Sequence, residues 1–170
     1  MANRVFNKIT VVDEQDNVTG YMHLPEALAQ GCIRRVAVAL LFNEKDEILL
    51  QKRASWVMIH PNCWDFSAGG HVDEGADYAE TAEKELYEEL GLKVTLVPVD
   101  TSLRHGDLFW GLFKGGVTSV TEIPYDSDEV AGVRWISIPE MEKEMKDKPQ
   151  SLNPTFTTMW KLYRDKILAA

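Results

Sequence analysis

One stretch of the sequence decides the fold: Gly70-His-Val-Asp-Glu-Gly-Ala-Asp-Tyr-Ala-Glu-Thr-Ala-Glu-Lys-Glu-Leu-Tyr-Glu-Glu-Leu-Gly-Leu92. At about 100° per residue its apolar residues form one stripe, which is typical of a helix that packs on a core. Gly69 and Gly70 precede the expected helix, Gly75 lies in the loop that leads into it, and Gly91 follows its last apolar residue as a C-cap. The segment therefore predicts a loop, an amphipathic helix and a second loop.

Three glutamates, Glu85, Glu88 and Glu89, share an arc of about 100° beside the apolar stripe. Like charges three or four residues apart cost an isolated helix about 0.2–0.5 kcal/mol per pair, so the cluster opposes helix formation unless a positive charge lies among them. A divalent cation would supply that charge, and carboxylate oxygens suit Mg²⁺ or Mn²⁺. The alternative interpretation is the solvated face of a glutamate-rich helix, which is common.

The spacing resembles the Nudix box: Gly, five residues, Glu, seven residues, Arg-Glu, an apolar residue, any residue, Glu-Glu, any residue, Gly and an apolar residue. Two positions depart from it, because Ala76 replaces the first Glu and Lys84 replaces the Arg. In the family these two brace the loop against the helix, so we interpret the double change as the loss of one ion pair. Asp77, close to Lys84 on the helical wheel, could supply some of the missing charge. The matching residues are Gly70, Glu85, Leu86, Glu88, Glu89, Gly91 and Leu92.

The resemblance implies a Mg²⁺- or Mn²⁺-dependent hydrolase that cleaves a diphosphate linkage, in a nucleoside diphosphate derivative or a related diphosphate, by attack of water at phosphorus. It implies that Glu85, Glu88 and Glu89 hold the metal and carry catalysis, with the backbone carbonyl of Gly69 as a further ligand. The base would be one of these glutamates or a carboxylate of the later loop 122–129. The candidates for substrate contacts are Arg53, His71 and Glu129, although His71 could simply brace the turn before the helix.

Four aromatic side chains could stack on the base of a nucleotide substrate. Each is more often a part of the core or of a pocket rim. These side chains are Trp56, Trp64, Phe109 and Trp110.

Beyond the box pattern itself, residues 11–14, 49–53, 61–65 and 69–72 make the chain similar to the branch of Nudix proteins that look like isopentenyl-diphosphate isomerase. The isomerases carry a catalytic cysteine one residue before the Gly-His pair, where Gly69 stands here. Cys63 lies upstream and is interpreted as a small packing residue, so the hydrolase interpretation leads. Two alternatives remain. One is a non-catalytic nucleotide- and metal-binding module whose box has lost some of its pattern residues, as Ala76 and Lys84 suggest. The other, less favoured, is the isomerase itself.

Composition sets the broad class. The chain has 170 residues, of which 45% are hydrophobic, so we expect one domain over residues 1–170 with its core over about 34–165. The net charge of −9 argues against nucleic acids and anionic membranes as partners, and favours a metal as the bridge to an anionic substrate. Two cysteines, no signal peptide and no apolar run long enough to span a bilayer predict a soluble, cytoplasmic protein. Dimers are frequent among similar proteins, so a homodimer is a further possibility.

The hydrophobic pattern predicts the remaining elements. Residues 9–12 and 18–22 form a hairpin with a polar turn, and 24–30 form a short helix. Residues 36–42 and 48–53 are expected to be paired strands, with further strands at 94–103, 108–113 and 133–138. Helices are expected at 139–146 and 154–169, the second with Asn153 as its N-cap. The order predicts an α+β fold with a mixed sheet covered by helices, and the resemblance implies a Nudix-type α/β/α sandwich with a central mixed sheet and an additional N-terminal hairpin.

Overall fold

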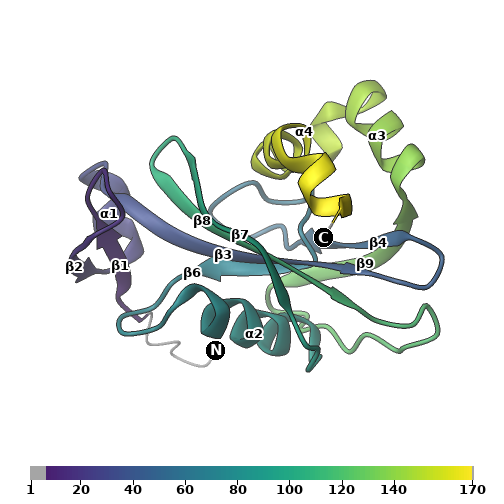
Figure 1. Cartoon of the computed structure of the whole chain (residues 1–170), viewed down its shortest axis with the longest axis horizontal. Helices are drawn as coiled ribbons and strands as arrows, with labels where there is room; N and C mark the ends of the chain where they lie inside the picture. Colours follow the sequence, from purple (N-terminus) through teal and green to yellow (C-terminus); the bar gives the residue numbers. More distant parts are fainter. Residues whose placement is uncertain (1–6, 170) are drawn as a thin grey trace.

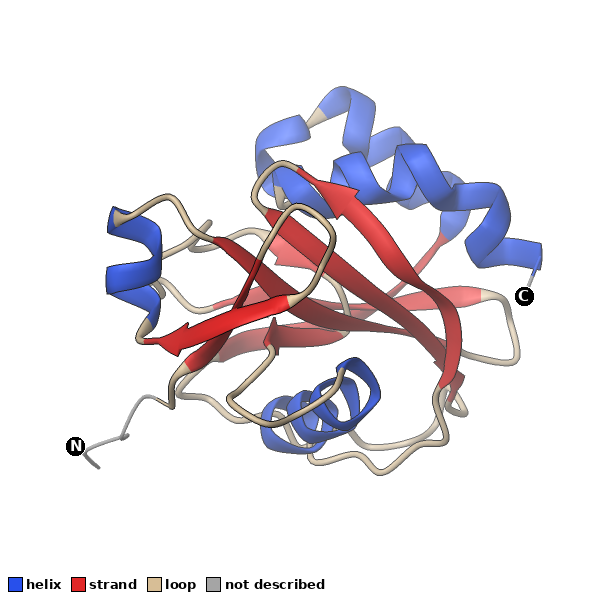
Figure 2. Cartoon of the chain, turned by 60° about the vertical axis from the view of Figure 1, so that its left-hand side comes forward, coloured by secondary structure: helices blue, strands red, loops and turns tan. Residues whose placement is uncertain are grey.

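The computed structural model describes residues 7–169. It contains one β-sheet with a helix below it and two helices above it (Figures 1 and 2). This is the predicted α+β architecture with a helix layer on each face. The elements are β1 (Ile9–Val12), β2 (Val18–Met22), α1 (Leu24–Ala29), β3 (Ile33–Phe42), β4 (Glu47–Arg53), β5 (Trp64–Asp65), β6 (Ala68–His71), α2 (Tyr78–Leu90), β7 (Val97–His105), β8 (Leu108–Gly116), β9 (Val130–Ser137), α3 (Ile138–Asp147), the 3₁₀ turn η1 (Pro149–Ser151) and α4 (Pro154–Ala169).

Strand β3 is the centre of the sheet, and its neighbours make the sheet mixed. It pairs in parallel with β8, from Arg34↔Leu108 to Phe42↔Gly116, and antiparallel with β6, where Val38 lies opposite Gly69. The expected pairing of β3 with β4 is limited to Phe42↔Ile48, next to the turn. Strand β4 instead pairs along its length with β9. Both long edges of β3 are already occupied by β6 and β8, so β4 has to diverge from it beyond the turn.

The core lies on both faces of the sheet. Leu40 of β3 packs in the cluster that α3 and α4 cover, whereas the next residue, Leu41, packs in the cluster that contains Leu86 and Leu90 of α2. Successive side chains of a strand point to opposite faces, and here both faces are covered. The continuous apolar run of β3 is explained by this double burial. None of the described helices is long and apolar enough to cross a membrane.

The N-terminal hairpin β1–β2 packs directly on the loop that leads into α2. The backbone N–H of Thr10 donates to the carbonyl of Val72 at 2.8 Å, and the N–H of Glu74 donates to the carbonyl of Lys8 at 2.8 Å. Ile9 forms an isolated bridge with Asp73. The hairpin therefore adds to the sandwich, as predicted, and also holds the loop before α2 in place.

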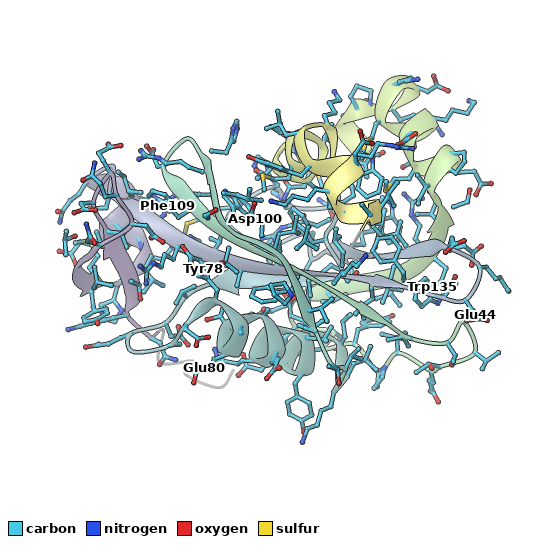
Figure 3. The ribbon with its side chains drawn as sticks, viewed as in Figure 1. Glu44, Tyr78, Glu80, Asp100, Phe109 and Trp135 are labelled. Carbon is cyan, nitrogen blue, oxygen red and sulfur yellow. The ribbon has the colours of Figure 1, made fainter. Side chains whose placement is uncertain are left out.

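A second contact joins the hairpin turn to the start of α2. The Tyr78 hydroxyl donates to Asp16 Oδ2 at 3.0 Å, and Arg35 Nε lies 2.7 Å from the other oxygen of the same carboxylate. Tyr78 lies between α2 and the sheet (Figure 3), where a Cβ on Gly111 would approach the Tyr78 Cβ to 2.7 Å. A side chain at position 111 would therefore require Tyr78 to shift.

Candidate active site

Helix α2 has a defined first and last residue, which fixes where its side chains point. Asp77 is the N-cap: its carboxylate accepts from the N–H of Glu80, whose side chain accepts from the N–H of Asp77. Gly91 ends the helix with a left-handed φ of 67°, as predicted for the C-cap. With Leu86 and Leu90 fully buried, this phase turns Glu85 and Glu89 towards β6.

Glu89 is a buried carboxylate held by two donors. Its Oε2 accepts from the N–H of Gly69 at 3.0 Å and from Gln51 Nε2 at 3.0 Å. Burial, followed by the charge of Glu85, raises the pKa of Glu89 to about 8, although both hydrogen bonds act in the opposite direction. The site thus keeps a carboxyl group in a position where its negative charge is costly without a cation nearby.

Gly69 is oriented by the same contact. Because its N–H points to Glu89 and not to β3, the pair Val38↔Gly69 is a non-hydrogen-bonded pair of the antiparallel ladder. The carbonyl of an extended residue points to the same side as its N–H, so the Gly69 carbonyl also faces away from β3. This orientation is compatible with the predicted role of the Gly69 carbonyl as a metal ligand.

Glu85 occupies the space that a side chain at position 70 would need. A Cβ built on Gly70 would lie 2.6 Å from Cδ and 2.7 Å from Oε1 of Glu85. Burial raises the pKa of Glu85 to about 7, while Lys84 acts to lower it. The close approach of backbone and carboxylate explains, in physical terms, why glycine stands at position 70.

Glu88 lies apart from this pair. Its side chain is 46% exposed and its carboxylate lies 3.4 Å from Lys84 Nζ. Across the described residues no three acidic, histidine or cysteine side chains converge closely enough to hold a metal ion as they stand. The predicted arc of three carboxylates is thus divided by the helix into an inward pair and an outward member at the rim.

Lys84 forms the ion pair that we expected to be missing. Its Nζ lies 2.9 Å from Asp73 Oδ2 and 3.7 Å from Glu85 Oε1. The expectation that Asp77 would supply the compensating charge was wrong, because its carboxylate caps the helix instead. The brace between loop and helix is therefore present, with Asp73 and Lys84 in place of the Glu and Arg of the box pattern.

The predicted substrate contacts lie around the same pair of glutamates. Arg53 Nε donates to the carbonyl of Ile59 at 2.9 Å, and its Nη1 lies 3.3 Å from Asp65 Oδ2. The positive charge of Arg53 acts to lower the pKa of Glu89, so the two groups share one electrostatic environment. The carbonyl of Glu129 accepts from the N–H of Ala54, which places its backbone beside the end of β4.

His71 lies at the end of β6 with an imidazole that favours the neutral form. Burial, assisted by the charges of Arg34 and Arg53, lowers the pKa of His71 to about 4. Its Nε2 is buried and has no hydrogen-bond partner within the part of the chain that the structure describes. A neutral ring with an unsatisfied nitrogen can accept or donate one hydrogen bond to a ligand.

The four aromatic side chains considered for base stacking differ in how much of their surface is exposed. Phe109 and Trp110 belong to the core, with 8% and 5% of their surfaces exposed, and Trp64 is half-buried beneath the guanidinium of Arg134 at 4.1 Å. Trp56 is different, because 66% of its surface is exposed. Of the four aromatic residues proposed to meet a substrate, Trp56 alone has a largely free surface.

Sequence reasoning missed Gln51 and Asp73. Gln51 is a buried polar residue in the otherwise apolar run 48–51, and such an interruption is a signal for a hydrogen-bonded partner across the sheet. Asp73 lies three residues before the altered box position Ala76, so a search for a displaced acidic residue in that loop could have found it.

Comparison with known proteins is consistent with this geometry. The NUDIX domain family model matches residues 33–156. The chain belongs to the Nudix family. A Pseudomonas aeruginosa protein named as an uncharacterized Nudix hydrolase is 35% identical, over 80% of this chain and 81% of its own length. This membership confirms the resemblance drawn from the box.

Other Nudix relatives match the predicted branch. An isopentenyl-diphosphate Delta-isomerase of Pectobacterium atrosepticum is 30% identical over 88% of this chain and 87% of its own. A prenyl-diphosphate phosphatase of Methanosarcina mazei is 25% identical over 86% and 88%. A crystal structure from Deinococcus radiodurans has a TM-score of 0.76 at 20% identity, covering 89% of this chain and 96% of that one. The Nudix fold is thereby confirmed.

Proposed function

We propose that this Nudix protein hydrolyses a diphosphate linkage with Mg²⁺ or Mn²⁺, by attack of water at phosphorus. We also propose that the chain forms a single Nudix domain. The observation that supports this most strongly is the inward pair Glu85 and Glu89. Glu89 is buried and the Glu85 side chain is 14% exposed, and their pKa values are raised to about 7 for Glu85 and about 8 for Glu89. Carboxylates with strongly perturbed pKa values cluster at functional sites. A divalent cation would offset both the burial and the mutual repulsion of the two groups.

The chemistry of the available donors fits such a cation, and Glu88 would have to turn inward to join Glu85 and Glu89. Hard oxygen donors are available from Glu85, Glu88 and Glu89 and from the carbonyl of Gly69, and these four would hold it. When bound, the metal would neutralise diphosphate oxygens and lower the pKa of a water molecule. Gln51 and the Gly69 N–H orient Glu89 through their hydrogen bonds. The proton of the attacking water would pass to one of the glutamates or to a carboxylate of the loop 122–129.

Arg53 and His71 are proposed to bind the substrate near these glutamates. Arg53 is the cation at the end of β4 whose charge acts against the rise in the pKa of Glu89 and helps to lower that of His71, so it stands where phosphate oxygens could be held. The neutral His71 would add one hydrogen bond from its buried Nε2. Two relatives act, by their names, on isopentenyl diphosphate and on prenyl diphosphates, so isoprenoid diphosphates belong in the substrate panel beside nucleoside diphosphate derivatives.

The isomerase alternative is disfavoured by the surroundings of Gly69. A Cβ at this position would lie 2.6 Å from Val38 Cγ1 and 2.9 Å from the Ala37 carbonyl oxygen. A cysteine there would require both neighbours to shift. The non-catalytic alternative rested on Ala76 and Lys84, and the Asp73–Lys84 ion pair weakens its motivation.

The test is release of phosphate or nucleotide from nucleotide sugars, dinucleotides, nucleoside triphosphates, coenzyme A and isoprenoid diphosphates, with Mg²⁺ or Mn²⁺. We expect metal-dependent turnover of at least one class, lost by about a hundredfold or more in Glu85→Gln with Glu89→Gln. Glu83→Gln, an exposed carboxylate on the same helix, is the matched control and should keep full activity. If no compound is turned over but metal and diphosphate still bind in calorimetry, the protein is a non-catalytic binding module.

A further inference from the structure

The loop between β4 and β5 exposes apolar side chains where a soluble surface would normally be polar. Trp56, Val57, Met58 and Ile59 are consecutive, and Trp56 and Met58 are 66% and 70% exposed. Arg53 and Asp65 bound the loop, and no charged residue lies between them. Runs of exposed apolar residues are unfavourable in water and generally indicate a contact surface.

The conformation of this loop is fixed by specific contacts. The Trp56 indole N–H donates to the carbonyl of Asp128 at 2.7 Å, and Arg53 Nε donates to the carbonyl of Ile59 at 2.9 Å. His60 and Asn62 have left-handed φ values of 48° and 62°, a region that His and Asn adopt more readily than most residues with side chains. The loop is thus held in a defined shape in which Trp56 and Met58 are exposed.

Both anchors of the loop lead back to the glutamate site. Arg53, at its base, lies two residues after Gln51 on the same face of β4, and Gln51 Nε2 donates to Glu89 Oε2 at 3.0 Å. On the other side, the N–H of Asp126 donates to the backbone carbonyl of Glu89 at 2.8 Å, and the same acidic segment contains the Asp128 carbonyl that holds Trp56. Trp56 and the backbone of Glu89 therefore contact the same segment, residues 126–128.

We propose that Trp56 and Met58 form the binding surface for a hydrocarbon chain attached to the diphosphate of the substrate, which names the substrate class of the proposed hydrolase and rests on it. A cation at the base of the loop followed by an uncharged apolar stretch complements a ligand with an anionic head and an apolar tail. A nucleobase would also need hydrogen-bonding partners, and the indole N–H is already donated to Asp128. The structure favours the hydrocarbon chain.

The experiment uses non-hydrolysable probes, so that it does not depend on turnover. These are the methyl, dimethylallyl and geranyl esters of methylenediphosphonate, each titrated into the protein in the presence of Mg²⁺ and followed by calorimetry. We expect the wild-type affinity to rise with chain length. In Trp56→Ala and in Met58→Ala the geranyl ester should bind about tenfold more weakly, with the methyl ester unchanged. Leu162→Ala, which removes an exposed leucine of α4, is the matched control and should behave as wild type.

Trp56→Phe separates the ring surface from its anchor, because phenylalanine keeps an aromatic face and loses the bond to Asp128. We expect it to retain most of the preference for the geranyl ester. The proposal would be overturned if the wild-type affinity did not depend on chain length, or if both alanine variants showed the same dependence on chain length as the wild type. It would also be overturned if Trp56→Phe lost as much affinity for the geranyl ester as Trp56→Ala. Absence of turnover in the substrate panel would overturn the hydrolase alone, since these titrations measure binding.

Discussion

Lys84 Nζ lies 2.9 Å from Asp73 Oδ2, which joins the second turn of α2 to the loop that precedes the helix. The two residues stand eleven positions apart, and the pair replaces a brace that the box pattern assigns to positions 76 and 84. The Lys84 side chain is 40% exposed, so water screens the interaction and its contribution to folding is modest. Its main effect is on where the loop lies relative to Glu85 and Glu88.

Replacement of Asp73 should therefore affect the site more than the fold. We expect Asp73→Asn to lower the free energy of unfolding by about 0.2–1 kcal/mol, the range of exposed ion pairs, and to reduce turnover by a larger factor. Chemical denaturation and steady-state kinetics measure the two effects. Glu74→Gln, an exposed neighbour in the same loop, is the control; equal losses in both variants would contradict a specific role for the pair.

Substitution of Gly70 should displace Glu85. In Gly70→Ala the new Cβ would meet the Glu85 carboxylate at 2.6 Å, and the carboxylate, at the end of a flexible side chain, has to move. We expect a weaker affinity for Mn²⁺, by about tenfold or more, with a small change in stability. Gly132→Ala in β9 has nothing within 4 Å of its Cβ and should bind Mn²⁺ normally. Unchanged Mn²⁺ affinity in Gly70→Ala would argue against Glu85 as a ligand.

Gln51 should affect activity because it orients the carboxylate of Glu89. Gln51→Leu keeps a side chain of similar size and removes the amide that donates to Glu89 Oε2 at 3.0 Å. Groups that orient a ligand commonly contribute about 10–100-fold to activity or metal affinity, and we expect a loss of that size in kcat. Gln30→Leu on the exposed end of α1 provides the comparison. If kcat is retained in Gln51→Leu, the Gly69 N–H alone suffices to orient Glu89.

Glu144 should make the protein sensitive to acid. Burial acts to raise the pKa of Glu144, but the Ser151 hydroxyl at 2.6 Å and the Arg134 guanidinium at 2.9 Å outweigh it, so the pKa lies below its ordinary value. The folded protein therefore binds this proton less readily than the unfolded chain does. The stabilisation is present above the ordinary glutamate pKa of 4.5 and is lost as pH falls through the lower, folded value.

The measurement is the free energy of unfolding from about pH 6 down to about pH 3. The wild type should lose more stability over this range than Glu144→Gln, which cannot titrate at this position. Glu83→Gln, which removes an exposed carboxylate, should follow the wild type. Parallel curves for wild type and Glu144→Gln would show that this group does not contribute to the acid sensitivity.

The sequence by itself determined the local structure and the family. The C-terminal end of α2 at the left-handed Gly91, the strands and the Asn153 cap depend on residues a few positions apart. The Asn153 Oδ1 accepts from the N–H of Thr155 at 2.9 Å. Such signals act along one element, so periodicity and capping rules detect them. The box spacing identified the Nudix family for the same reason.

Only the tertiary structure decided which of these residues meet. Gln51 and Glu89 are 38 positions apart, and their contact depends on how β4, β6 and α2 pack. The same packing separates Glu88 from Glu85 and Glu89, gives Lys84 the partner Asp73 instead of Asp77, and moves β4 from β3 to β9. A helical wheel fixes the direction of a side chain around one axis. The identity of its neighbour, and the burial that raises the pKa of Glu89, come from elements distant in the chain.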